Sequence, residues 1–202
     1  MKKVFGKVFV TMLAVMLATV TGYAWIKVTE AQNSVTRSVQ VSVDEASNGK
    51  LLMGEKSTAL GEGAMRSTGT AELKPCTSED GVTFRNEVGD KVSTGYTDSY
   101  TVYVKSGDTN HALAVRNVII GGFGAEDAIT DALRVAVTYG GETKVYDRTS
   151  SFDDVFSLSV SNKDATALTV TVWYEGTDDA CTAENALDNS GSVSVKVVLG
   201  MV

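Results

Sequence analysis

The sequence has little proline, histidine or cysteine, and each scarcity argues against a kind of protein. The one proline, Pro75, excludes a proline-rich linker, and no internal repeat is visible. The one histidine, His111, would have to serve any Ser-His-Asp or Cys-His arrangement, and it stands where a loop meets a strand. No H-E-x-x-H motif occurs, and one histidine cannot build a histidine-rich zinc site. We therefore expect that the protein is not an enzyme and that it binds neither a metal nor a cofactor.

Basic residues are also scarce outside the N-terminus. Residues 25–202 hold 15 basic and 25 acidic side chains, a formal charge of −10. Nucleic-acid binding and docking on anionic lipid both depend on clustered Lys and Arg. We therefore expect no nucleic-acid partner, and contact with a membrane only through the N-terminal segment.

The N-terminus resembles an export signal. A positive segment, Met1–Lys7, precedes a nearly continuous apolar run at Val8–Val20. This run is shorter than the roughly 20 residues that span a bilayer, and small residues follow it. The pattern predicts a hydrophobic signal helix that a signal peptidase removes.

We place the cut after Ala24, so that the mature chain starts at Trp25. The expected organisation is a signal peptide at 1–24 and a single extracellular domain at 25–202. One alternative is an uncut N-terminal anchor. Another is a type IV prepilin leader, cut after Gly6, which requires an acidic residue at the position where the sequence has Thr11.

Apolar and polar residues alternate repeatedly along the body, as they do in half-buried strands. The predicted strands are Val39–Val43, Tyr100–Lys105, Ala112–Ile120, Leu133–Tyr139, Thr143–Tyr146, Val155–Val160, Leu168–Tyr174 and Val193–Leu199. Gly140-Gly141 predicts a tight hairpin turn between two of them. Many strands and little helix indicate an all-β fold, an antiparallel β-sandwich of immunoglobulin-like or jelly-roll-like type. A closed barrel stays open as an alternative.

Three segments carry other expectations. Asp178–Leu187 predicts one short helix, capped by Thr177 or Asp178. Ala125–Ala132 adds a single helical turn. Leu51–Arg66 contains three glycines, which disfavour a helix, and is interpreted as a long surface excursion with a short strand.

Two cysteines, Cys76 and Cys181, predict one disulfide in an exported chain. Closing a loop of this length stabilises a fold by about 4–5 kcal/mol on the chain-entropy argument. Two free buried thiols are the alternative. The acidic clusters lack the spacing of a calcium loop, and we interpret them as solvated loops. These clusters are Glu126-Asp127, Asp153-Asp154 and Glu175/Asp178/Asp179.

The residues around the predicted cut, Thr21-Gly22-Tyr23-Ala24-Trp25, resemble leaders processed by the SipW-type signal peptidase. Two body segments, Leu73–Phe84 and Val172–Cys181, are similar to uncharacterised secreted proteins of clostridia. The wider resemblance is to the TasA and camelysin group of β-sandwich proteins, in which TasA builds extracellular matrix fibres. This resemblance implies a secreted structural protein. Camelysin has been described as a metalloprotease, but this sequence contains no zinc motif that would support that activity.

Two functions follow as hypotheses. The first is a secreted subunit of a surface fibre or biofilm matrix that pairs with itself or with related matrix subunits by strand donation. The candidate donor is Trp25–Val43, and its alternating apolar residues are Ile26, Val28, Val39, Val41 and Val43. The alternative is that this segment is the first strand of its own sandwich. The second function is a monomeric cell-surface module that binds a glycan or protein through loops 51–66 and 121–132.

Overall fold

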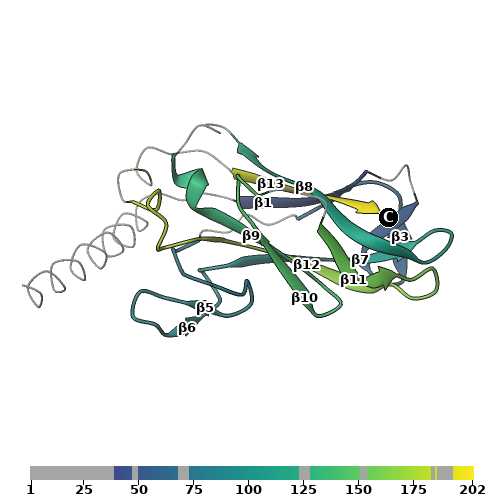
Figure 1. The fold of residues 1–202 in the computed structure, drawn as a ribbon, viewed down its shortest axis with the longest axis horizontal. Coiled ribbons are helices and arrows are strands. Elements are labelled where there is room, and N and C mark those ends of the chain that lie inside the picture. The colour runs from purple at the N-terminus through teal and green to yellow at the C-terminus, as the bar shows by residue number, and fades with distance from the viewer. Residues whose placement is uncertain are drawn as a thin grey trace, which may run out of the picture.

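The computed structural model describes residues 39–46, 50–67, 73–122, 128–150, 154–182, 185 and 193–202. The predicted leader, its cut at Ala24 and Trp25, and the donor residues Ile26 and Val28 lie outside these ranges. Within them the fold is a two-layer β-sandwich, as the alternation predicts (Figure 1). A small hairpin projects from one end of it.

The two layers are sheets of five and six strands. Sheet A has the order β11-β8-β13-β1-β4, with bounds Asp154–Val160, His111–Gly122, Val193–Met201, Val39–Glu45 and Met65–Arg66. Sheet B has the order β10-β9-β12-β7-β2-β3, with bounds Glu142–Tyr146, Leu133–Tyr139, Thr166–Tyr174, Asp98–Ser106, Leu51–Lys56 and Ala59–Gly61. The projecting hairpin is β5 (Phe84–Arg85) and β6 (Lys91–Val92).

One strand pair departs from the expected antiparallel pattern. β1 lies parallel to β13 along its whole length, from Val39 opposite Val193 to Glu45 opposite Leu199. Its other side pairs antiparallel with the two residues of β4. Hydrophobic alternation sets which face a strand buries but not its direction, so the sequence could not reveal this pair.

The inner core lies between the sheets and consists mainly of the inward residues of each alternating strand. Val39, Val41 and Val43 of β1 are fully buried there. Tyr139 of β9 and Phe156 of β11 make an edge-to-face contact, with ring centroids 5.6 Å apart. Stacked sheets about 10 Å apart are filled by such interdigitating side chains.

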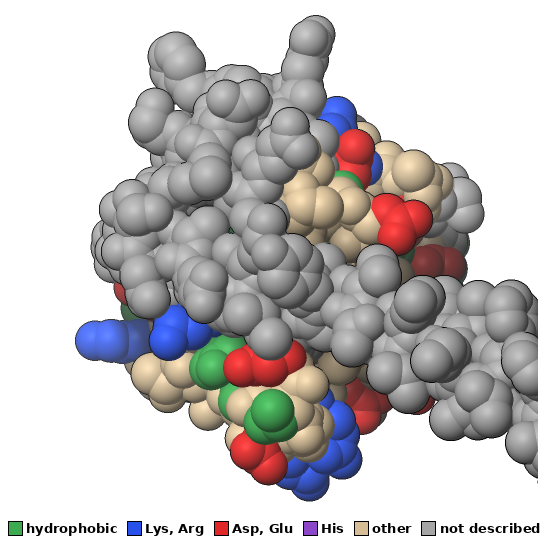
Figure 2. Space-filling view, turned by 90° about the vertical axis from the view of Figure 1, so that its left-hand side faces the viewer, with side chains coloured by type: hydrophobic (Ala, Val, Ile, Leu, Met, Phe, Trp, Pro, Cys, Tyr) green, Lys and Arg blue, Asp and Glu red, His purple; other side chains and the backbone are tan. Residues whose placement is uncertain are grey.

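A second, smaller cluster lies outside the sandwich, on the outer face of sheet B. The excursion of residues 73–97 folds over that face and buries Trp173 and Ala136 of the sheet beneath Cys76 and Phe84. Phe84 meets Trp173 edge-to-face at 5.2 Å. In the end-on view, the lobe that carries β5 and β6 displays hydrophobic side chains among acidic and basic ones (Figure 2). Val82 and Val88 of this lobe are largely exposed.

All eight predicted strands are confirmed, as is the Gly140-Gly141 turn, where both glycines have positive φ. The predicted helical turn before β9 is a 3-10 helix, Ala128–Ala132. The predicted helix Asp178–Leu187 is wrong at its start, because the chain turns at residues 178–180 and Cys181 N donates to Asp178 O at 2.9 Å. Asn185 is helical, and its N donates a hydrogen bond of 3.2 Å to Thr182 Oγ1. Residues 183, 184, 186 and 187 lie outside the described ranges.

Candidate functional site

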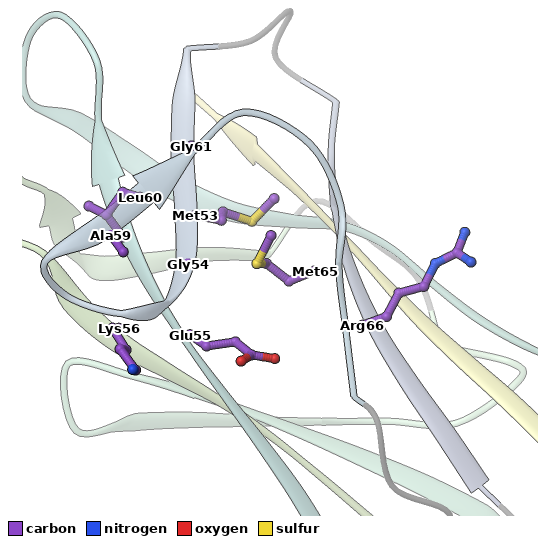
Figure 3. Close-up of a pocket in the computed structure, with 9 residues that line it drawn as sticks. All are labelled: Met53, Gly54, Glu55, Lys56, Ala59, Leu60, Gly61, Met65 and Arg66. Carbon is purple, nitrogen blue, oxygen red and sulfur yellow. The ribbon is translucent and has the colours of Figure 1, made fainter.

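An open groove of about 630 Å³ lies where the β2–β3 hairpin faces β4 (Figure 3). It falls within Leu51–Arg66, one of the two loop regions predicted to bind a ligand. The lining residues are Met53, Gly54, Glu55, Lys56, Ala59, Leu60, Gly61, Met65 and Arg66. The segment predicted as a surface excursion with one short strand therefore forms three strands and joins sheet B to sheet A.

Gly54 explains why the chain turns so tightly here. A Cβ at position 54 would lie 2.0 Å from the carbonyl oxygen of Ala59, so only glycine fits beneath the returning strand. The pairing of β2 with β3 also shifts register between Met53 and Lys56. The groove lies between this irregular hairpin and β4.

The floor of the groove is apolar and its rim is charged. Met53 is fully buried, and Met65 is half-buried and packs on the inner core. Both thioether side chains project into the groove, whereas Arg66 points away from it (Figure 3). Methionine adapts its shape to different apolar partners, so this floor suits an apolar side chain.

Glu55 supplies the acidic group of the rim. Its carboxylate accepts a hydrogen bond of 3.3 Å from the Tyr100 hydroxyl. Burial, followed by the charge of Glu55, raises the pKa of Tyr100 to about 12. The phenol therefore stays a neutral hydrogen-bond donor at physiological pH and holds Glu55 beside the groove.

The predicted donor residues Val39, Val41 and Val43 occupy strand β1 of their own sandwich. Their side chains are fully buried in the inner core. This placement is the alternative that the sequence left open for this part of the segment. It concerns only residues from Val39 onward.

The predicted Cys76–Cys181 disulfide is absent, and both residues are free buried thiols. The two side chains pack into different clusters, Cys76 in the outer one and Cys181 in the inner core. Cys76 Sγ instead contacts the carbonyl oxygen of Tyr96 at 3.7 Å. Burial is the largest cause that raises the pKa of each thiol to about 12, so both are poor nucleophiles.

His111 is the first residue of β8 and contacts the loop of residues 107–110 that joins β7 to β8. Its Nε2 is 3.0 Å from Asp108 Oδ1 and 3.0 Å from Thr109 Oγ1. A catalytic relay needs the carboxylate on one ring nitrogen and the nucleophile on the other, and here both contacts use the same nitrogen. This histidine fastens its loop.

Asp108 anchors the same loop through several donors. Hydrogen bonds to its carboxylate, the largest from the Thr109 backbone N–H, hold the pKa of Asp108 well below its usual range. Lys50 Nζ lies 3.4 Å from the other carboxylate oxygen.

The acidic cluster after β12 is occupied by protein donors. Glu175 accepts hydrogen bonds from Trp173 Nε1 at 3.2 Å and from Thr177 Oγ1 at 2.7 Å. Asp178 pairs with Arg134. Among the described residues, no group of three or more His, Cys, Asp or Glu side chains is arranged to hold a metal ion. Glu126, Asp127 and Asp153 lie outside the described ranges.

Sequence reasoning located the groove segment but missed the residues that give it chemistry. Met53 and Met65 face each other only because the chain crosses from sheet B to sheet A between them. The available signal was the combination of alternating Leu51 and Met53 with closely spaced glycines, which marks a bent strand pair.

The chain matches no protein-family model, and no curated protein matches it by sequence. In the part of the chain that the structure describes, no helix has the length and hydropathy to cross a membrane. The fold is that of an all-β sandwich.

Proposed function

We propose that the protein is an exported structural subunit of a surface fibre or biofilm matrix, of the kind built by TasA-like proteins. Subunits join by strand donation, in which an extended segment of one copy completes a sheet of the next. The leader-like N-terminus and the acidic, all-β body support this proposal. Its partners are further copies of itself or related matrix subunits, and a signal peptidase releases the mature chain.

The position of β1 is the observation that carries this proposal. The described chain enters the sandwich through a strand whose inner side pairs fully with β13 and whose outer side pairs with only two residues of β4. Within the described part of the chain, that outer side is covered by β4 and Ser67 only from Val41 to Val43, so a strand that replaces them can pair along β1. A contact between the N-terminal segment of one copy and this edge of another is heterologous, and such contacts propagate as filaments when they do not close.

The test is assembly of the mature chain. Residues 25–202 are expressed, and polymerisation is followed by light scattering and negative-stain microscopy. A matched chain that lacks residues 25–35 keeps every described residue of the sandwich. Filaments from the longer chain alone are the expected result. A monomer under all conditions from both chains would contradict the proposal.

The groove favours a second candidate, a cell-surface module that binds an external ligand at its methionine floor. An apolar floor beside one carboxylate suits a peptide that carries an apolar residue next to a basic one. Monomeric protein that binds such peptides, and loses them in a Glu55→Gln or Met65→Ala variant, would favour this function over the fibre.

A further inference from the structure

Residues Ala59–Arg66 form a strap along one long side of the sandwich. The strap contains β3, the link of residues 62–64 and β4, so it covers the outer edge of both sheets. Glu62 and Arg66 are exposed on it. Short strands and exposed charges are the usual means by which sheet edges are kept from pairing with other molecules.

The strap is held by few contacts. β3 pairs with β2 at two positions separated by a register shift, and β4 pairs with β1 at two positions. The next residue, Ser67, makes two hydrogen bonds with Val41: its amide donates to the Val41 carbonyl at 2.9 Å, and its Oγ accepts from Val41 N at 3.1 Å. Beneath the strap is the open groove and not a packed interface, and its main apolar anchor is the half-buried Met65.

The strands under the strap are held far more firmly on their other sides. β1 has seven paired positions with β13, and β2 has four with β7. Displacement of the strap would therefore leave both sheets in place and would free the outer edge of β1. An edge of about seven residues is roughly 23 Å long.

We propose that the strap is a displaceable guard, which lifts from β1 to let an extended segment of a second copy pair there. The inference rests on the proposed function and names the acceptor edge of that assembly. The freed groups are backbone N–H and C=O groups, which only an extended backbone satisfies in register. Residues 25–38, the part of the mature chain before β1, number 14. Half of them suffice to cover this edge, and the other half span about 23 Å between copies.

Locking the strap tests the proposal directly. Ser42 and Arg66 are partners across β1 and β4. Because Ser67 N donates to Val41 O in the neighbouring pair, the 42/66 pair is non-hydrogen-bonded, with Cα atoms about 4.5 Å apart. A disulfide fits that spacing, so a Ser42→Cys/Arg66→Cys variant of the mature chain can be closed by oxidation and reopened by reduction. The native thiols are buried and separate from this pair.

The matched control is a Thr138→Cys/Thr143→Cys variant. These residues are partners across β9 and β10, on the other long side, and their hydroxyls lie 2.9 Å apart. The oxidised strap variant should stay monomeric and should assemble after reduction, whereas the control should assemble in both states. If the oxidised strap variant forms filaments as fast as its reduced form, the proposal is wrong while the fibre function stands.

Loosening the strap should act in the opposite sense. Met65→Ala removes its apolar anchor, and assembly should become about tenfold faster because the open form is more populated. An unchanged or slower rate in this variant would count against the guard.

If no variant assembles, the fibre function fails, and hydrogen exchange on the monomer then tests the strap alone. We expect the Ser67 amide to exchange at least about tenfold faster than the amides of β12, and oxidation of the 42/66 pair to slow it. Protection equal to that of β12 before oxidation would overturn the proposal.

Discussion

The two long sides of the sandwich are closed in different ways. On one side β10 and β11 bind each other across the layers, since Glu142 accepts a 2.8 Å hydrogen bond from Ser157 N. On the same side, Tyr139 donates a 3.3 Å hydrogen bond to the Ser159 carbonyl. The other side carries the strap and the open groove. One side is fastened by hydrogen bonds between the two sheets, while the other carries the strap that we propose to be displaceable.

The largest expected effect is on the closed side. Tyr139→Ala removes a fully buried ring and its contact with Phe156, and should lower the free energy of unfolding by about 3–5 kcal/mol. Tyr139→Phe keeps the ring and should cost only about 1 kcal/mol. On the open side, Met65→Ala should cost about 1–2 kcal/mol because Met65 is only half-buried. Urea unfolding of the three variants measures this order, and equal losses for Tyr139→Ala and Met65→Ala would break the comparison.

Glycine substitutions give a smaller contrast. Gly140 has φ +60, and a Cβ there would lie 2.5 Å from Leu158 Cδ2 of β11. Gly140→Ala should therefore cost about 2–3 kcal/mol, from the left-handed backbone and the displaced leucine together. Gly141→Ala, with φ +84 and open space, should cost about 1 kcal/mol.

The matching position on the strap is Gly61, where a Cβ meets nothing within 4 Å. Gly61→Ala should stay within about 0.5 kcal/mol of the parent protein. Thermal unfolding of the three alanine variants gives the series. A loss at Gly61 as large as that at Gly140 would show that the strap is packed as tightly as the closed side.

The smallest expected effect is on pH dependence. The Ser157 backbone hydrogen bond and the neighbouring Lys144 lower the pKa of Glu142 to about 2 in the folded protein, from 4.5. A carboxyl whose pKa is lowered by folding stabilises the fold above its unfolded pKa, and this contribution is lost as the pH falls from about 4.5 toward 2. Glu142→Gln should reduce the pH dependence of stability in that window. Identical acid curves for the parent protein and Glu142→Gln would contradict this role.

The sequence predicted the inner core well because strand alternation depends only on which face each residue presents. Val135, Val137 and Tyr139 of β9 are buried, as their alternation predicts. The sequence predicted the groove poorly. Position 54 must be glycine because the carbonyl of Ala59 lies against it, and this contact exists only in the folded hairpin. The prediction of a disulfide between Cys76 and Cys181 was wrong for a similar reason. Their number suggested a bond, but their positions in separate clusters are a property of the three-dimensional fold.

The parallel pairing of β1 with β13 has a mechanical consequence. A pull that enters the described body at Val39 and leaves at the C-terminal end of β13 draws the two strands past each other along their common axis. All seven paired positions then carry the load together and cannot open one at a time like a zipper. A tensile load applied through these two ends therefore acts in shear on the β1–β13 pair, the direction in which paired strands resist separation most.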